Sequence, residues 1–535
     1  MFYISLIPFI VLLIYDFKKS LHMAQQNLYN DDHRFLKWTI KDMKSFKTPL
    51  KCSLVVVITY LLLILLKLNS RLITEIYFFV VSLIILIIKM KENKGSDTKI
   101  GLKVTARVKR LIITNVIILA LISFGLYCVK NVNLIYLTLF IYEILLNFVL
   151  MISIIINKPV EKFVYLSYKN KAVSKLKSMN NLKVIGITGS YGKTSSKNIL
   201  SDILNVKYNA LPSPKNFNTP YGLIITVNNY LDKFDDILIA EMGAYKVGEI
   251  KELCDLVKPK YGILTKIGTA HIEIFGSQEN IQKGKFELIE SLPSDGVGIL
   301  NADDELQVNY KLKNDCKIIW IGIDNKDADV RALDIKTSNK GTTFNVVFKG
   351  DKKKYSFTTK LLGYNNIYNI LASLALSKEF GLSIEQMQKA VLNVRSVEHR
   401  LELREAGNIT YIDDSYNSNP VGSHMSLNVL ESMPGLRIVM TPGMVELGDK
   451  SYELNKKFGT YMKDSADVVI LVGEKITKPI KEGLKEVKFD SKNIYVVKST
   501  KEAFALVKSL SSGKETYCLI ENDLPDIYNE YELIL

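Results

Sequence analysis

The chain has 535 residues, too many for one hydrophobic core, and it is 48% hydrophobic with a formal net charge of +15. This composition excludes a disordered chain, and five scattered cysteines without a CxxC pair exclude a disulfide framework and a zinc ribbon. The apolar residues gather in the first 157 positions, with much of the basic excess between the apolar runs. This arrangement favours membrane topology over nucleic-acid binding, and we expect no nucleic acid as a partner.

The first 157 residues predict a membrane domain with about five helices and the lipid bilayer as a partner. One apolar run, 2–15, is short for a span, and the alternative of a signal-peptide core lacks a basic leader and a cleavage site. We count it as a span together with four further runs, which are 54–66, 72–88, 111–129 and 134–156.

The charges between these runs predict their orientation. Segments 16–51 and 89–110 are rich in lysine and arginine, whereas the connections 67–71 and 130–133 are very short. Basic loops stay on the cytoplasmic side of a membrane. We therefore expect a multi-pass protein of the cell (inner, cytoplasmic) membrane whose remaining domains are cytoplasmic.

From residue 158 the pattern changes to short β-rich runs that alternate with helical stretches, which is typical of α/β domains with a mostly parallel sheet. We expect a central domain over 158–396 and a smaller Rossmann-like domain over 397–535. The second domain is indicated by the short apolar runs RIVMTPG, DVVILVG, NIYVVKS and ETYCLIEN.

A strand, a glycine turn and a helix follow one another at KVIGIT-GSYGKTSSKNILSDIL, from residue 183 to 204. A plain strand–helix turn is the alternative, but lysine and threonine stand at the offsets that phosphate binding requires. The glycines let backbone N–H groups converge on phosphate oxygens, the lysine supplies a cation, and a hydroxyl of Thr194 or Ser195 can hold Mg²⁺. The expected nucleotide-binding residues of this loop are Thr188, Gly189, Gly192, Lys193, Thr194 and Ser195.

The loop and several later motifs, in fixed order, resemble the Mur amide ligases, which build the peptide stem of peptidoglycan. The motifs are SPKNFNTPYG (213–222), EMGAYKVGEI (241–250), ILTKIGTAHIEIFGS (263–277), GKFELIE (284–290), LNADDE (300–305), GYNNIYNILAS (363–373), EHRLE (398–402), DDSYNSNP (413–420) and GMVELG (443–448). KNFN, DSYNSNP and GMVELG are most similar to the member of the family that adds D-alanyl-D-alanine to the UDP-muramoyl tripeptide.

This resemblance implies the fold and the reaction. The chain is expected to combine a transmembrane bundle with the central and C-terminal α/β domains of a Mur ligase. ATP would phosphorylate a carboxylate of a cell-wall precursor, and the amine of an amino acid or dipeptide would then displace phosphate from the acyl phosphate. Catalysis of this kind relies on positioning and on neutralising charge, with ATP and Mg²⁺ as cofactors.

The resemblance also implies roles for single residues. Lys193 would bridge the outer phosphates, and Glu241 and His271 would ligate Mg²⁺ with Thr194; the alternative for His271 is a structural histidine. Lys285 would be carbamylated and catalytic, against an ordinary exposed helix lysine. The residues expected to contact the nucleotide are Asn366 and Asn369 together with Arg400 and Asp414, which would arrive when the C-terminal domain closes. A polar turn is the alternative for DDSYNSNP.

Two departures from the family concern the substrate. Only about 25 residues separate the last apolar run from the phosphate-loop strand, too few for the domain that holds the UDP-sugar. The stretch 518–528 is acidic where the family is basic. We expect either a lipid-linked or a UDP-linked acceptor, and we favour the lipid-linked one.

Two other classes of function remain as alternatives. A transporter or sensor could use nucleotide as a switch, although the chain has the full order of ligase motifs. A catalytically dead scaffold is disfavoured because Lys193, Glu241, His271 and Asp414 are present.

Overall fold

The computed structural model describes residues 2–522 apart from 28, 30–32, 45–47, 69, 93–100, 130, 270–271, 417–418 and 446. The chain forms two compact units that divide after Leu166. We call residues up to Leu166 the helical unit and Ser167–Leu524 the ligase unit. The expected domain limits 1–157, 158–396 and 397–535 stay a prediction.

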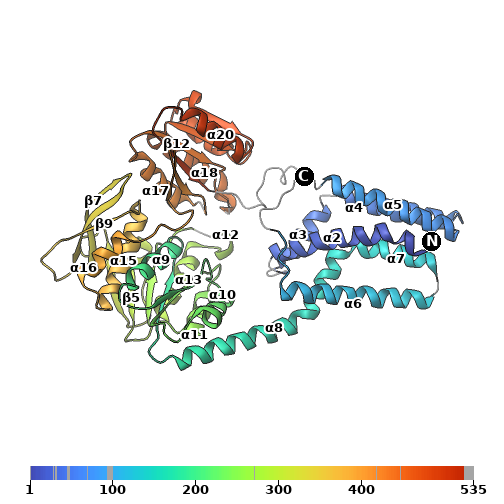
Figure 1. The fold of residues 1–535 in the computed structure, drawn as a ribbon, viewed down its shortest axis with the longest axis horizontal. Helices are drawn as coiled ribbons and strands as arrows, with labels where there is room; N and C mark the ends of the chain where they lie inside the picture. Colours follow the sequence, from blue (N-terminus) through green and yellow to red (C-terminus); the bar gives the residue numbers. More distant parts are fainter. Residues whose placement is uncertain are drawn as a thin grey trace. The chain divides into compact units, whose positions relative to one another are not determined.

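The helical unit contains, among the described residues, helices only (Figure 1). They are α1 (Phe2–Ser5), α2 (Ile7–Gln26), α3 (Arg34–Lys44), α4 (Thr48–Leu65), α5 (Arg71–Glu92), α6 (Ala106–Val129), α7 (Val132–Ile144) and α8 (Leu146–Ser178), the last of which continues into the ligase unit. Aromatic rings form much of its core: Phe78 lies 4.2 Å from Tyr136 and 4.8 Å from Phe140, centroid to centroid.

The apolar runs are helical, but they do not make five spans. In the described part of the chain two helices are long and apolar enough to cross a membrane, 71–91 and 106–126. A third would require that 133–144 and 146–178 count as one span, although they meet at 74°. The predicted span 134–156 is therefore bent at Leu145, and the apolar part of α4, 54–65, is short. Apolar length alone does not distinguish a span from a packed helix.

The first sheet of the ligase unit has nine strands in the order β2-β3-β1-β4-β5-β6-β7-β8-β9. Strands β2 to β7 run parallel, and β7, β8 and β9 are antiparallel. Their bounds in chain order are β1 (Lys183–Thr188), β2 (Ala210–Pro212), β3 (Ile237–Glu241), β4 (Tyr261–Leu264), β5 (Val297–Asn301), β6 (Lys317–Gly322), β7 (Val330–Ser338), β8 (Gly341–Phe348) and β9 (Tyr355–Thr359).

Helices cover both faces of the parallel part, which explains why β1 and β3 are almost entirely buried. One face packs against α9 (Lys193–Leu204), α15 (Tyr364–Glu379) and α16 (Ile384–Leu392), and α11 (Glu249–Val257) and α13 (Gln278–Glu290) lie on the other. Shorter helices are α10 (Pro220–Ile225), the π-helical turn η2 (Thr226–Tyr230), α12 (Ile272–Phe275) and α14 (Glu305–Val308). The order of strands reverses beside β1, the position where α/β sheets bind ligands at their carboxyl ends.

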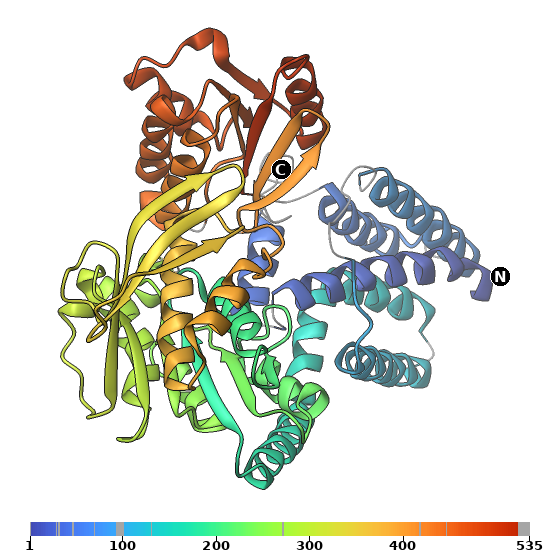
Figure 2. The ribbon, with the colours of Figure 1, turned by 60° about the vertical axis from the view of Figure 1, so that its left-hand side comes forward.

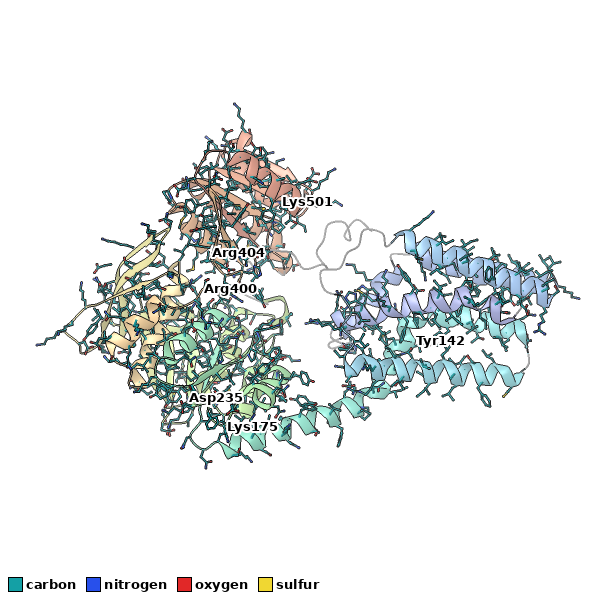
Figure 3. All side chains as sticks on the ribbon, viewed as in Figure 1. Tyr142, Lys175, Asp235, Arg400, Arg404 and Lys501 are labelled. Atoms are coloured by element: carbon teal, nitrogen blue, oxygen red, sulfur yellow. The ribbon has the colours of Figure 1, made fainter. Side chains whose placement is uncertain are left out.

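Helix α8 is attached to this domain through its last turns. The amine of Lys175 donates to the carbonyl of Leu231, and the Nδ2 of Asn228 donates to the carbonyl of Tyr168 at 2.9 Å. Figure 3 shows Lys175 on α8 near Asp235, which follows in the same loop as Leu231.

The second sheet has six strands in the order β10-β11-β15-β12-β13-β14, parallel except for β10. The elements are β10 (Glu402–Ala406), β11 (Ile409–Asp414), α17 (Pro420–Glu431), β12 (Leu436–Thr441), η3 (Gly448–Lys450), α18 (Ser451–Ser465), β13 (Val468–Val472), α19 (Lys478–Glu486), η4 (Ser491–Asn493), β14 (Ile494–Val497), α20 (Thr500–Leu510) and β15 (Thr516–Glu521). The ligase unit therefore has the expected α/β fold with two sheets.

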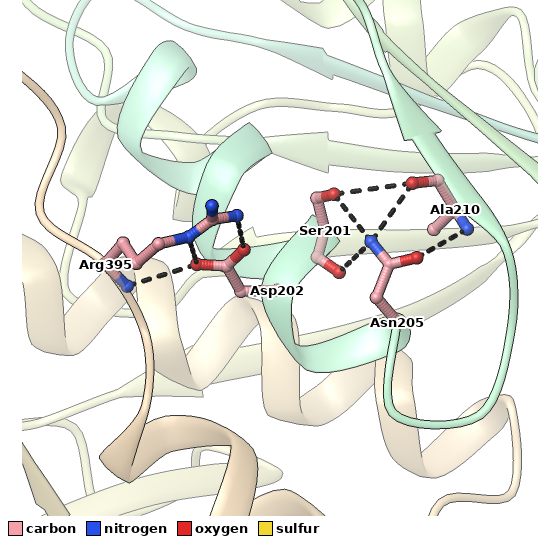
Figure 4. Close-up of polar contacts among 5 residues, drawn as sticks. All are labelled: Ser201, Asp202, Asn205, Ala210 and Arg395. Carbon is pink, nitrogen blue, oxygen red and sulfur yellow. Dashed lines mark hydrogen bonds and ion pairs between the residues drawn. The ribbon is translucent and has the colours of Figure 1, made fainter.

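Side-chain contacts join these sheet domains in addition to the chain itself, and two of them involve the β7–β8 hairpin and the linker after α16. The β7–β8 hairpin reaches the C-terminal domain (Figure 2), where the Nδ2 of Asn339 donates to the hydroxyl of Tyr517 at 3.0 Å. In the linker after α16, Arg395 binds Asp202 of α9 through its backbone N–H and its guanidinium, with Nη2 2.6 Å from Oδ1 (Figure 4). Since α9 begins at the phosphate loop, the linker is attached to the helix that carries this loop.

Candidate active site

The glycine loop lies between the carboxyl end of β1 and the first turn of α9, as the sequence predicts. Gly189 has φ +148°, and a Cβ there would lie 1.9 Å from the Oγ1 of Thr265. Gly192 has φ +81°, and its Cβ would lie 3.1 Å from the Oδ1 of Asn369. Only glycine fits this conformation and this close approach, so the backbone N–H groups at the start of α9 stay accessible to an anion.

Lys193 has no acidic ion-pair partner in the part of the chain that the structure describes. Its amine donates to the carbonyls of Gly189 at 2.8 Å and Ser190 at 3.3 Å, and no carboxylate of a described residue lies within ion-pairing distance. Burial lowers the pKa of Lys193 to about 8, although the charge of Glu241 opposes this shift. An ammonium that has only carbonyl partners beside a glycine loop is suited to bind phosphate oxygens.

Glu241 ends β3 next to the loop and is ionised. Burial alone would raise its pKa, but the charges of Lys197 and Lys193 lower it. Its Oε1 accepts hydrogen bonds from the Oγ1 of Thr194 and the Nδ2 of Asn218, both at 3.2 Å. Its Oε2 is buried and is paired with the ammonium of Lys197 at 3.0 Å.

This donor set fits Mg²⁺. A carboxylate oxygen with unused lone pairs and a hydroxyl within hydrogen-bonding reach of the same carboxylate are hard oxygen ligands beside a phosphate site. The structure brings Thr194 to Glu241, whereas it shows no such contact for the other candidate hydroxyl, Ser195. The expected third ligand, His271, lies outside the described residues.

Lys285 is only 2% exposed and lies on α13. Its amine donates to the carbonyl of Ala244 at 3.3 Å and lies 5.4 Å from the ring centroid of Phe275. Burial and the nearby charge of Lys193 lower the pKa of Lys285 to about 7. The residue is therefore not an exposed helix lysine, and its neutral form is well populated at neutral pH.

A narrow cavity adjoins the loop and offers amide groups and an aromatic ring to a planar ligand. Its lining is Tyr191, Gly192, Ile263, Leu264, Thr265, Lys266, Asn301, Ile321, Asn365, Tyr368, Asn369 and Ala372. The expected Asn369 is among them. The expected Asn366 instead donates to the carbonyl of Leu362 at 2.8 Å, and the hydroxyl of Thr188 donates to the carbonyl of Met242 at 2.8 Å.

Asn365, Asn301 and Tyr368 are among the cavity residues that sequence reasoning did not select. A signal for these residues was available, because Asn365 and Tyr368 lie in the GYNNIYNILAS motif and Asn301 lies in the LNADDE motif. Tyr368 is held by Asp303, whose Oδ2 accepts its hydroxyl at 2.9 Å.

The C-terminal domain contributes Arg400 to the loop. Its Nη2 lies 3.5 Å from the Oγ1 of Thr194, and its guanidinium lies over the ring of Tyr416, 4.5 Å from the centroid. The hydroxyl of Tyr416 accepts a hydrogen bond at 3.2 Å from Asn216 of the central domain. Asp414 does not reach the loop: it is bonded to the hydroxyl of Ser426 at 2.5 Å, and burial raises its pKa.

His399, Glu402 and Asp413 form a further cluster with metal-ligand geometry. The cluster has its own cation, because Arg404 lies 2.8 Å from the Oε2 of Glu402 and 3.4 Å from the Oδ2 of Asp413. His399 also bonds Asp413, at 2.9 Å. Each carboxylate of the cluster therefore has a partner within the protein.

A glycine loop at the carboxyl end of a central parallel strand, with an ammonium, a hydroxyl and a carboxylate beside it, defines a P-loop nucleotide-binding α/β protein. Comparison with models of known protein families identifies the family within this class. The Mur ligase middle domain matches residues 187–377, and the Mur ligase glutamate ligase domain matches 399–520. The chain belongs to the Mur ligase family, whose MurF members are ATP-dependent ligases that form a C–N bond and use Mg²⁺.

Three relatives named UDP-N-acetylmuramoyl-tripeptide--D-alanyl-D-alanine ligase are about equally similar. The protein from Escherichia coli K12 is 31% identical over 295 residues, which are 55% of this chain and 65% of that protein. The protein from Bacillus subtilis 168 is 32% identical over 297 residues, which are 55% of this chain and 63% of that protein. The protein from Buchnera aphidicola of Acyrthosiphon pisum is 31% identical over 346 residues, which are 62% of this chain and 74% of that protein. The chain thus spans slightly less than two thirds of the first two relatives.

Solved structures agree on the fold. MurF from Acinetobacter baumannii aligns with a TM-score of 0.61 at 23% identity, covering 69% of this chain and 80% of that one. MurF from Thermotoga maritima in complex with ADP aligns with a TM-score of 0.60 at 24% identity, covering 69% and 82%.

The expected location in the cell membrane is wrong. Among the described residues two helices are long and apolar enough to cross a membrane, or three if the bent pair counts as one span, and this does not establish a multi-pass membrane protein. The expectation rested on apolar length and basic loops, and helices that pack against one another can have both.

Proposed function

We propose that this protein is an ATP-dependent amide ligase of peptidoglycan precursor synthesis that joins D-alanyl-D-alanine to a UDP-muramoyl tripeptide. The observation that carries the proposal is the convergence of two domains on one nucleotide loop. Lys193, Thr194 and Glu241 come from the central domain, and Arg400 comes from the C-terminal domain. A nucleotide-hydrolysing switch needs only the residues of the central domain. A ligase must also hold a second reactant against an activated carboxylate, which a second domain at the site can do.

The chemistry follows from these positions. The terminal carboxylate of the peptide attacks the γ-phosphorus of ATP, the bond to ADP breaks, and an acyl phosphate forms. The amine nitrogen of D-alanyl-D-alanine then attacks the acyl carbon, phosphate leaves, and the ammonium proton is lost to water or to a basic residue. Lys193 and Arg400 neutralise the charge that develops on the transferred phosphoryl group. Bound Mg²⁺, held by Glu241 and Thr194, would supply further neutralisation on the phosphates.

We propose that Lys285 carries a carbamate. Its buried amine with a pKa of about 7 supports this, because only the neutral amine adds to CO₂. The carbamate would place a negative charge near Lys193, whose positive charge already lowers the pKa of Lys285.

The acceptor is proposed from the relatives, whose names specify a UDP-N-acetylmuramoyl tripeptide. The comparisons lend no support to a lipid-linked acceptor or to a bilayer as partner, so the UDP-linked form replaces the one that the sequence favoured.

The test is an assay with purified full-length protein, UDP-muramoyl tripeptide, D-alanyl-D-alanine, ATP and Mg²⁺. We expect phosphate release that requires both substrates, with a product mass equal to the two joined minus water. ATP hydrolysis that ignores both substrates would instead support a nucleotide-driven switch and would contradict the proposal.

A further inference from the structure

Lys197 has no assigned role, yet it is among the largest fully buried side chains of the described protein, at 1% exposure. It lies on α9 one helical turn after Lys193, on the same face of the helix. A buried ammonium is costly unless it is paired, so its partners indicate what it does. Those partners are the Oε2 of Glu241, at 3.0 Å, and the carbonyl oxygen of Lys215.

The first partner is the carboxylate of the proposed Mg²⁺ site. The two oxygens of Glu241 have different partners: Oε1 accepts from Thr194 and Asn218, and Oε2 is paired with the ammonium of Lys197. The ion pair therefore fixes the rotation of the carboxylate group, so that one edge faces the phosphate loop. Because a carboxylate oxygen has two lone pairs, Oε2 can accept the ammonium of Lys197 and still offer a lone pair to a cation.

The second partner belongs to the loop 213–219. Lys215 has φ +48°, a conformation that residues other than glycine rarely adopt, and its carbonyl accepts the amine of Lys197. The same loop reaches Glu241 a second time through the Nδ2 of Asn218, and its Asn216 contacts Tyr416 of the C-terminal domain. One carboxylate is thus attached to the loop from both sides.

We propose that Lys197 is a positioning residue that holds Glu241 and the 213–219 loop as one unit, so that divalent-cation binding at the ATP site depends on it. The inference rests on the proposed function, because the cation is the one that accompanies the nucleotide. It predicts that loss of Lys197 weakens cation binding while the phosphate loop still binds nucleotide, since Lys193 and the N-terminus of α9 are unchanged.

The experiment compares Lys197→Met with Lys197→Arg in the full chain. Mn²⁺ binding in the presence of ADP is measured by electron paramagnetic resonance at 10 °C, and ADP binding in EDTA by calorimetry. We expect about a tenfold weaker Mn²⁺ affinity for Lys197→Met, ADP affinity in EDTA within about twofold, and recovery of most Mn²⁺ affinity in Lys197→Arg. The matched control is Lys207→Met, whose amine donates to the carbonyl of Gly381 at 2.8 Å in the same domain, and it should bind Mn²⁺ normally.

A folded Lys197→Met protein with lower thermal stability and unchanged Mn²⁺ affinity would overturn the inference, because a merely structural lysine behaves in this way. If Lys197→Met does not fold, Asn218→Ala decides, since it removes only the neutral attachment of the loop to Glu241. We expect the Mn²⁺ affinity of Asn218→Ala to fall about threefold. An unchanged affinity would refute the proposal that Glu241 and the 213–219 loop act as one unit. Absence of any Mn²⁺–ADP binding by the unmodified protein would instead contradict the proposed function.

Discussion

Lys89 in the helical unit is buried and Lys193 in the ligase unit is half-buried, and their partners differ. The amine of Lys89 on α5 lies 2.5 Å from the Oδ2 of Asp16 on α2 and 2.6 Å from the Oε1 of Glu143 on α7. Lys193 has two backbone carbonyls and no described carboxylate within ion-pairing distance. Lys89 is paired with carboxylates of its own unit, whereas Lys193 has no carboxylate partner among the residues that the structure describes.

This difference separates a structural lysine from one that binds a ligand. The paired cluster joins three helices and needs nothing from outside. Lys193 and Lys285 of the ligase unit have lowered pKa values and no carboxylate partner among the described residues. We expect the charge of Lys193 to be balanced by bound phosphate and the amine of Lys285 to be converted to a carbamate. Lys197 has features of both kinds of lysine: it is paired with a carboxylate, and that carboxylate, Glu241, also belongs to the proposed Mg²⁺ site.

The largest effect is expected at Lys193. Lys193→Met should lower ATP-dependent ligation by about 10³-fold, because the cation is lost from a site with little water to screen the transferred charge. Coupled phosphate release measures the rate, and thermal unfolding should change little. Lys258→Met, an exposed lysine that pairs with Asp255, is the control. Ligation within tenfold of the unmodified protein would mean that the unpaired charge is not there for phosphate.

The paired lysine should give the opposite result. Lys89→Met leaves Asp16 and Glu143 buried without their cation, which should lower the free energy of unfolding of the helical unit by about 3 kcal/mol. Differential scanning calorimetry measures this loss, and the ligation rate at low temperature should stay within about twofold. The triple variant Lys89→Met, Asp16→Asn, Glu143→Gln should recover part of the stability, and no recovery would contradict the ion-pair account.

Lys285 sharpens the comparison through pH. Because its pKa of about 7 lies well below the usual value, the neutral amine that adds to CO₂ is abundant above pH 7 and scarce below it. With ¹³C-bicarbonate, the carbamate signal in NMR should rise as the pH increases through 7, and Lys285→Gln should lose it together with about 10² in rate. Lys283, exposed on the same helix, is the control as Lys283→Gln. A carbamate signal that persists in Lys285→Gln would assign it elsewhere.

The smallest effect is expected at the linker. Arg395 has 84% of its side chain exposed, so its ion pair with Asp202 should contribute no more than about 1 kcal/mol (Figure 4). We expect Asp202→Asn to lower the melting temperature slightly and to change turnover by less than threefold, more at low salt than at high. A tenfold loss of turnover would instead show that the linker contact is part of the closure of the C-terminal domain.

The sequence predicts the nucleotide loop well because the pattern is local. Strand, glycines, lysine and helix follow one another, and Glu241 follows as well, since parallel strands end at the same edge. Contacts between distant segments were not predictable. Lys197 reads as an ordinary helix lysine until β3 and the 213–219 loop are placed beside it.

Helix rotation explains another limit. Successive residues differ by about 100° around a helix, so Asn365 lines the cavity while Asn366 bonds the carbonyl of Leu362. Motif position alone does not separate the two. In the helical unit the bend at Leu145 was equally hidden, because the residues on both sides of it are apolar.

The central claim is that the unpaired charges of the ligase unit serve an acyl-phosphate ligation. The most direct measurement is positional isotope transfer: the tripeptide carboxylate of UDP-muramoyl tripeptide is labelled with ¹⁸O, and the phosphate released during turnover with D-alanyl-D-alanine is analysed by mass spectrometry. The account predicts one ¹⁸O atom in each phosphate, because the carboxylate oxygen that attacks ATP leaves with the phosphoryl group. Unlabelled phosphate would show that water, not the carboxylate, accepts the phosphoryl group, and would contradict the account.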